Sequence, residues 1–283
     1  MKPHRLGLAL SVLGVIVGAA AFASLAGAGS TGKAATSAGK VLRANFISSC
    51  RFSHQSNDDP IVYPNQVGKS HLHQFVGNDS TNAASTLTSL QAATTSCRRS
   101  GDTAAYWAPA LLQGTTPVAP TGATIYYRRS TKKALSAFPA GLKMIAGSSM
   151  AMTAQNARVT SWNCGPLVDV ANSSEIPSCP DGANLRLHVR FPSCWDGKNL
   201  DSADHKSHLA YPVGRGCPSD HPVSVPAIEL IMKYPVLGGA DYQLSSGGPF
   251  SGHADFFNAW NQQELKRLVA ACLNAGRHCG TRG

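Results

Sequence analysis

The chain has 283 residues, of which 43% are hydrophobic and 14% charged, and its formal net charge is +10 at pH 7. This length and apolar content are enough to bury a substantial core, so one domain or a compact pair is expected. The basic residues are spread along the chain in short groups, which argues against a nucleic-acid-binding groove. The simpler interpretation is a solvated basic surface. The alternative is that the basic charge attracts an anionic cell wall or acidic polysaccharide.

The N-terminus has the pattern of a secretory signal peptide. Lys2 and Arg5 precede an apolar run that starts at Leu6, and small residues follow it. We expect residues 1–28 to be removed after Ala28, which makes the protein secreted and extracellular. An uncleaved anchor is the alternative and would be the only membrane contact. Residues 29–45 are predicted to be a disordered linker and residues 46–283 a single extracellular domain.

Alternating or β-branched runs bounded by Gly, Pro and Ser predict strands at residues 123–128, 142–146, 185–191, 223–234 and 242–245. A helical stripe is predicted only over residues 254–275, and Gly276 supplies its stop. The fold class is therefore β-rich, mainly antiparallel, sandwich or jelly-roll-like, with a C-terminal helix and long disulfide-tied loops. The loop at residues 192–222 is long enough to suggest a functional role.

The eight cysteines all follow the signal segment, and an even number in an oxidising compartment predicts four disulfides. A zinc site is the alternative, but the chain has no C-x-x-C pair. Pairing neighbours along the chain closes the smallest loops and serves as a working hypothesis: Cys50 with Cys97, Cys164 with Cys179, Cys194 with Cys217, and Cys272 with Cys279.

The first candidate site contains His71 and His73 in a segment of strand-like composition. In a strand, residues two apart face the same side. Two such imidazoles suit a metal pair, or an acid-base histidine with a partner that orients it. The alternative is a pair of histidines hydrogen-bonded in the wall of a polar cleft.

The second candidate is the stretch at residues 191–212, which holds three aspartates, two histidines, two lysines and a tyrosine. This density of proton-carrying groups, beside a Trp195 that could stack on a sugar, is typical of a site. The alternative is a surface loop whose aspartates and asparagine make turns.

The third candidate is the pair His253 and Asp255, which we expect at the start of the C-terminal helix. They could join His71 and His73 as metal ligands, or act as a base with its orienting carboxylate. In the alternative, Asp255 interacts with the helix dipole and His253 caps the helix or packs nearby.

Other chemistry lacks its usual signals. The chain has no G-x-S-x-G, no H-E-x-x-H and no P-loop pattern. Serine hydrolases, zincins and nucleotide-binding enzymes are therefore not supported.

Several stretches together resemble the secreted domain-of-unknown-function family DUF1996: residues 59–62, 70–75, 106–107, 139–147, 191–212 and 253–256. The run F-P-S-C-W-D-G-K-N-L-D is the most specific of them, and the resemblance covers roughly Asp59 to Cys279. Members of that family look extracellular, and fungal members are often joined to sugar-binding WSC modules. The resemblance therefore implies a role on glycans by association. Asn261 departs from the family pattern, which often has Asp there.

We hypothesise a polysaccharide-acting hydrolase whose site forms where the three candidate segments converge. The expected catalytic residues are Asp196, Asp201, Asp204, His208 and Asp255, and the expected substrate-binding residues are Trp107, Trp195, Lys198 and Tyr211. A lyase would instead use His208 or Tyr211 as base and Lys206 or Arg190 to neutralise a uronate.

Two other classes remain open. One is a metal-binding protein in which His71, His73 and His253, with Asp255 as a further candidate, bind a divalent metal as cofactor. The other is a non-catalytic cell-wall or glycan-binding module. The expected partner is a polysaccharide or cell-wall glycan, and no nucleic acid is expected.

Overall fold

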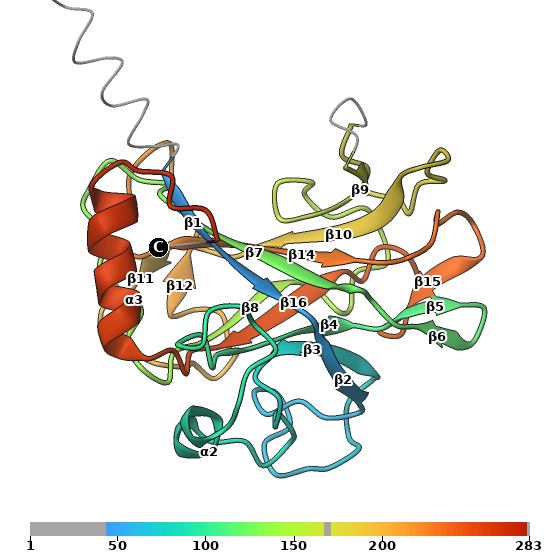
Figure 1. Ribbon diagram of the computed structural model, residues 1–283, viewed down its shortest axis with the longest axis horizontal. Helices are drawn as coiled ribbons and strands as arrows, with labels where there is room; N and C mark the ends of the chain where they lie inside the picture. The colour runs from blue at the N-terminus through green and yellow to red at the C-terminus, as the bar shows by residue number, and fades with distance from the viewer. Residues whose placement is uncertain (1–43, 167–170, 282–283) are drawn as a thin grey trace, which may run out of the picture.

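The computed structural model describes residues 44–166 and 171–281 (Figure 1). The predicted signal peptide and residues 29–43 of the predicted linker lie outside the described residues. Ala44 is buried, and the first strand begins at Asn45, the last residue of the predicted linker.

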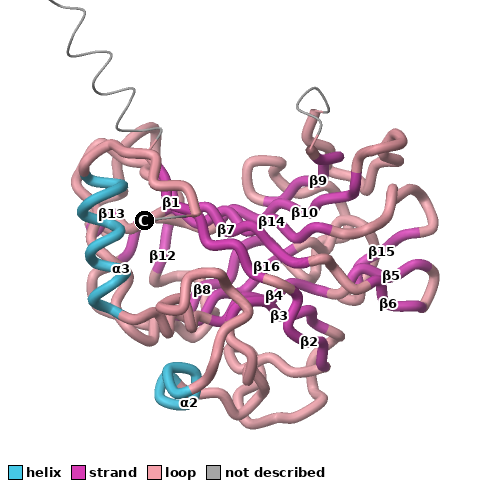
Figure 2. Tube along the Cα trace, in the orientation of Figure 1, coloured by secondary structure: helices cyan, strands magenta, loops and turns pink. Residues whose placement is uncertain are grey.

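Two five-stranded antiparallel sheets form the body of the protein (Figures 1 and 2). The first has the order β1 (Asn45–Cys50), β7 (Gly122–Arg128), β14 (Ala227–Lys233), β10 (Asn184–Arg190) and β9 (Thr160–Gly165). The second has the order β2 (Phe52–Ser56), β3 (His73–Gly77), β4 (Ala105–Pro109), β16 (His253–Phe257) and β8 (Lys143–Gly147).

Two small three-stranded antiparallel sheets complete the β structure. One has the order β15 (Tyr242–Leu244), β5 (Leu111–Gln113) and β6 (Thr116–Val118), and the other has the order β12 (Leu209–Ala210), β11 (Cys194–Trp195) and β13 (Val223–Ser224). Together with the short helices, this confirms the predicted β-rich, mainly antiparallel fold class with a C-terminal helix.

The main core lies between the two large sheets. Phe46 and Tyr127 of the first sheet, and Tyr106 and Phe256 of the second, are fully buried members of one apolar cluster. Residues alternate between the two faces of a strand, so Ala254 and Phe256 of β16 face this core. His253 and Asp255 consequently lie on the opposite face of the second sheet.

That opposite face is also covered. A second, smaller apolar cluster includes Phe75, Trp107 and Phe257 from the sheet and Ile61 and Leu90 from the long segments between β2, β3 and β4. Helix α2 (Leu87–Ala92) belongs to this cover and lies below the second sheet in Figure 1. Polar residues on this face are therefore enclosed rather than exposed to solvent.

The C-terminal helix is shorter than the predicted range of residues 254–275. Strand β16 occupies His253–Phe257, α3 spans Gln262–Leu268, and a π-helical turn, η1, continues over Val269–Asn274. The helix begins after Asn261, whose side chain accepts a hydrogen bond from the backbone N–H of Glu264. The expectation that His253 and Asp255 open this helix is therefore wrong.

Asn261 gives a direct test of this helix boundary. Replacing it with Ala leaves an orphan backbone N–H in the first turn, so we expect the free energy of unfolding to fall by about 1 kcal/mol. Asn261→Asp keeps the cap and should leave stability nearly unchanged. Urea unfolding followed by tryptophan fluorescence measures both; equal losses in the two variants would contradict the capping role.

The five predicted strands lie in or beside observed ones. The predicted strand at residues 223–234 is divided into β13 and β14, with Pro226, which has no backbone N–H to donate, between them.

All four disulfides of the working hypothesis are confirmed: Cys50–Cys97, Cys164–Cys179, Cys194–Cys217 and Cys272–Cys279. They are consistent with an extracellular protein.

The Cys194–Cys217 disulfide closes the predicted functional loop at residues 192–222.

Within residues 44–166 and 171–281, no helix has the length and apolar character to cross a bilayer.

Candidate functional site

The three candidate segments meet in one pocket of about 290 Å³, over the covered face of the second sheet. Its lining includes His71 from the first segment, Asp204, His205 and Lys206 from the long loop, and His253 and Asp255 from β16. Segments separated by up to about two hundred residues therefore form a single polar site.

His73 lies at the start of β3 and is fully buried. Its Nδ1 is 3.0 Å from the backbone carbonyl oxygen of Asp58. A carbonyl oxygen can only accept, so Nδ1 carries the proton and donates it. The lone pair is therefore on Nε2, the ring atom that approaches His253.

His253 is held in the same way. Its Nδ1 donates to the carbonyl oxygen of Ser251 at 2.9 Å, which leaves the lone pair on Nε2. The Nε2 atoms of His253 and His73 lie 3.5 Å apart. Two neutral imidazoles thus point lone pairs at each other.

His71 completes a cluster of three imidazoles. It precedes β3 rather than lying within it, but its ring centroid is 4.2 Å from that of His73 and 5.0 Å from that of His253. One nitrogen from each ring lies within 4.8 Å of the other two. The Nε2 of His71 is buried and has no hydrogen-bond partner among the described residues.

Burial keeps this cluster uncharged. Desolvation lowers the pKa of His71 to about 4 and that of His253 to about 3. Burial, followed by the neighbouring His71 and His253, holds the pKa of His73 well below its ordinary value. At neutral pH all three rings are neutral, the form in which imidazole binds a metal ion.

Two carboxyl groups adjoin the cluster. Asp255 is buried in β16, its Oδ2 has no hydrogen-bond partner within the described chain, and burial followed by the nearby Asp59 raises its pKa well above the usual range. Burial also raises the pKa of Asp59, although its Oδ1 accepts from the N–H groups of Ile61 and Val62. Asp59, His73 and Asp255 offer ligand atoms within 4.8 Å of one another.

Asp59 was not among the predicted site residues. It belongs to the D-P-I-V stretch of the family resemblance, but its sequence neighbours gave no sign of a site.

The carboxylates of two predicted catalytic aspartates accept hydrogen bonds from backbone N–H groups and so stabilise turns of the loop. Asp196 accepts hydrogen bonds from the backbone N–H groups of Lys198 and Asn199. Asp204 lines the pocket, yet it accepts from the N–H groups of Lys206 and Ser207, which lower its pKa.

Asp201 and His208 likewise have structural partners. Asp201 pairs with Lys143 at 3.2 Å and with His205 at 2.8 Å. His208 is buried between the hydroxyl of Ser202 and the carbonyl of Lys143. Neither residue lines the pocket with Asp255.

None of the four predicted substrate-binding residues lines this pocket. Trp107 is fully buried in β4, so the expectation that it stacks on a sugar is wrong. Trp195 donates its indole N–H to the carbonyl of Asn199, and Tyr211 donates to the carbonyl of Arg190. Lys198 is exposed on the loop.

One residue of the lyase alternative does reach the pocket. Lys206 lines it and donates from Nζ to the carbonyl of Gly147 at 2.7 Å. Its ammonium group is therefore held at the wall of the pocket.

Comparison with known families gives a match that covers most of the described chain. A family model described as "Domain of unknown function (DUF1996)" covers residues 59–260, a range that contains all three histidines and both carboxyl groups of the site. No curated protein and no solved structure matches the chain.

Proposed function

The chain belongs to the DUF1996 family, and we propose that this member is a metal-dependent protein in which His71, His73 and His253 bind one divalent transition-metal ion. Three protein nitrogens leave a further coordination position for water or substrate, as in catalytic zinc sites. The chemistry this supplies is metal-assisted hydrolysis. From the family resemblance, the expected substrate is an extracellular glycan.

The observation that carries the proposal is the 3.5 Å approach of the Nε2 atoms of His73 and His253. Zinc–nitrogen bonds of about 2.0–2.1 Å in tetrahedral geometry separate two ligand nitrogens by about 3.3 Å. The two imidazoles are thus nearly at the spacing that a shared ion requires.

The orientation of the rings supports the same conclusion. Metal-binding histidines usually donate their second N–H to a carbonyl or carboxylate, which fixes the ring and its tautomer. The carbonyls of Asp58 and Ser251 have this role for His73 and His253. Without an ion, two lone pairs repel each other and the buried Nε2 of His71 has no partner among residues 44–166 and 171–281, which is an unfavourable arrangement.

Elemental analysis of the purified protein after dialysis against a zinc- or copper-containing buffer tests the proposal. We expect about one metal ion per chain in the native protein and almost none in His71→Ala and His253→Ala. His278→Ala, which removes an exposed imidazole that neither lines the pocket nor belongs to the cluster, is the matched control and should retain the metal. Circular dichroism checks that each variant is folded; metal retained by both cluster variants would refute the site.

A metal-free glycosidase is the second candidate, because Asp59 and Asp255 line the same pocket with carboxylate oxygens within 4.8 Å. Retaining glycosidases place their two carboxyl groups about 5–5.5 Å apart. Sugar release from a polysaccharide panel, lost in Asp255→Asn and unaffected by a chelator, would favour this candidate. Release that the chelator abolishes would favour the metal-dependent hydrolase.

A further inference from the structure

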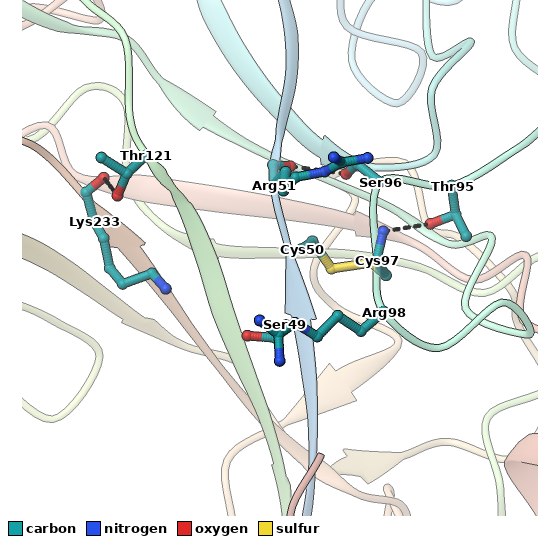
Figure 3. Close-up of a pocket in the computed structure, with 9 residues that line it drawn as sticks. All are labelled: Ser49, Cys50, Arg51, Thr95, Ser96, Cys97, Arg98, Thr121 and Lys233. Carbon is teal, nitrogen blue, oxygen red and sulfur yellow. Dashed lines mark hydrogen bonds between the residues drawn. A yellow bond between two sulfur atoms is a disulfide. The ribbon is translucent and has the colours of Figure 1, made fainter. Parts of the chain in front are cut away.

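Another pocket of the described chain, of about 470 Å³, is drawn in Figure 3; it shares no lining residue with the pocket at the histidine cluster. It forms where β1 ends, beside the 95–98 segment, the start of β7 and the end of β14. Arg51, Arg98 and Lys233 line it, and no acidic residue does.

Within the part of the chain that the structure describes, the positive charges around this pocket have no ion-pair partner. Lys233 lies directly opposite Arg186 in the β10–β14 ladder, and like charges at such positions repel each other. Burial lowers the pKa of Lys233, and the charges of Arg186 and Arg98 lower it further. None of the ion pairs found within residues 44–166 and 171–281 includes Arg51, Arg98, Arg186 or Lys233.

The walls of the pocket are firmly tied. The Cys50–Cys97 disulfide joins them, with Arg51 and Arg98 each next to one of its cysteines in the sequence (Figure 3). The N–H of Arg51 donates to the carbonyl of Ser96, and Ser96 Oγ donates to the carbonyl of Arg51. The N–H of Arg98 donates to the carbonyl of Ser49. The backbones of Arg51 and Arg98 are therefore held in place before any ligand binds.

We propose that this pocket binds a sugar unit carrying a carboxylate or sulfate group, within an acidic extracellular polysaccharide. An oxyanion between Arg98 and Lys233 would relieve the repulsion there, and charge-assisted hydrogen bonds to oxyanions are strong. The pocket is much larger than a bare oxyanion and falls in the size range of small-molecule sites, about 300–1,000 Å³. Removal of Lys2 and Arg5 with the signal peptide leaves a formal net charge of 10 − 2 = +8, which attracts such a polymer at long range.

Affinity electrophoresis and titration calorimetry test the proposal, with polygalacturonate as the carboxylate probe, dextran sulfate as the sulfate probe and neutral dextran as control. We expect the native protein to bind at least one anionic polymer and not the neutral one. The double variant Arg98→Gln/Lys233→Gln should weaken this binding by about tenfold per charge removed. Removing Lys233 also relieves repulsion, so the variant should fold.

The matched control is Lys69→Gln/Arg158→Gln, which removes the same charge from two exposed positions outside the pocket. We expect its affinity to stay within about twofold of native, because loss of distant charge changes only the screened long-range attraction. Equal weakening in the two double variants, or equal binding to neutral dextran, would overturn the pocket. The two proposals can be refuted separately, because metal content tests only the histidine cluster and polymer binding tests only this pocket.

Discussion

Adding Zn²⁺ to the metal-free protein should raise its free energy of unfolding by about 4 kcal/mol when the free ion exceeds its dissociation constant a thousandfold. For a domain of this size, that corresponds to a rise of about 10 °C in melting temperature. The physical reason is that the three imidazoles converge only in the folded chain, where His73 and His253 are fixed by carbonyl groups. All eight cysteines are in disulfides, so the unfolded chain offers no thiolates to compete for the ion.

Differential scanning calorimetry with Zn²⁺, Cu²⁺ and Mg²⁺ measures this effect. Mg²⁺ prefers oxygen ligands and should leave the melting temperature unchanged, whereas imidazole suits Zn²⁺ and Cu²⁺. In His71→Ala the zinc-induced rise should largely disappear, while His278→Ala should keep it. An equal rise with Mg²⁺, or an undiminished zinc effect in His71→Ala, would argue against an imidazole site.

The sequence predicted the first sheet better than the second, and burial explains the difference. In β7 one face meets the core and the other is more exposed, so the buried Ala123, Ile125 and Tyr127 alternate with less buried residues. In β3, β4 and β16 every residue is buried, because the second sheet is covered on both faces. Polar residues such as His73 and Asp255 occupy buried positions there, and the period-two pattern is lost.

The buried aromatic residues before the helix explain why the predicted helix starts too early. Phe256 and Trp260 continue the apolar spacing of α3 towards the N-terminus by coincidence, although Phe256 belongs to β16. The cap at Asn261 was the local signal that could have placed the boundary.

For the candidate site, the sequence indicated residue types but not their partners. His71, His73 and His253 were expected as metal ligands, and they do lie together. His73 and His253 are oriented by the backbone carbonyls of Asp58 and Ser251, which no side-chain pattern reveals. Conversely, the aspartates at 196 and 204 looked catalytic because of their density, yet their oxygens accept from nearby backbone N–H groups. Short loops produce such turns from the same residue types that active sites use.

A second large effect is expected at Glu229, a buried residue of β14 on the face of the first sheet away from the core. Its carboxylate contacts Arg128 at 2.6 Å, Arg190 at 2.8 Å and His188 at 3.0 Å. Burial alone would raise the pKa of Glu229, but the hydrogen bond from His188 and the charges of the two arginines lower it to about 2 from an ordinary 4.5. This difference corresponds to about 3 kcal/mol of stability at neutral pH.

Because the folded-state pKa is the lower one, this stability is present above about pH 4.5 and is lost as the pH falls towards 2. Glu229→Gln should therefore cost about 3 kcal/mol at pH 7, and the difference from native should shrink steadily between pH 4.5 and 2.5. Urea unfolding at several pH values measures it, with Glu175→Gln, at an exposed glutamate, as the matched control. A loss in Glu229→Gln that does not change with pH would mean that packing, rather than the charge of the carboxylate, holds this face of the sheet together.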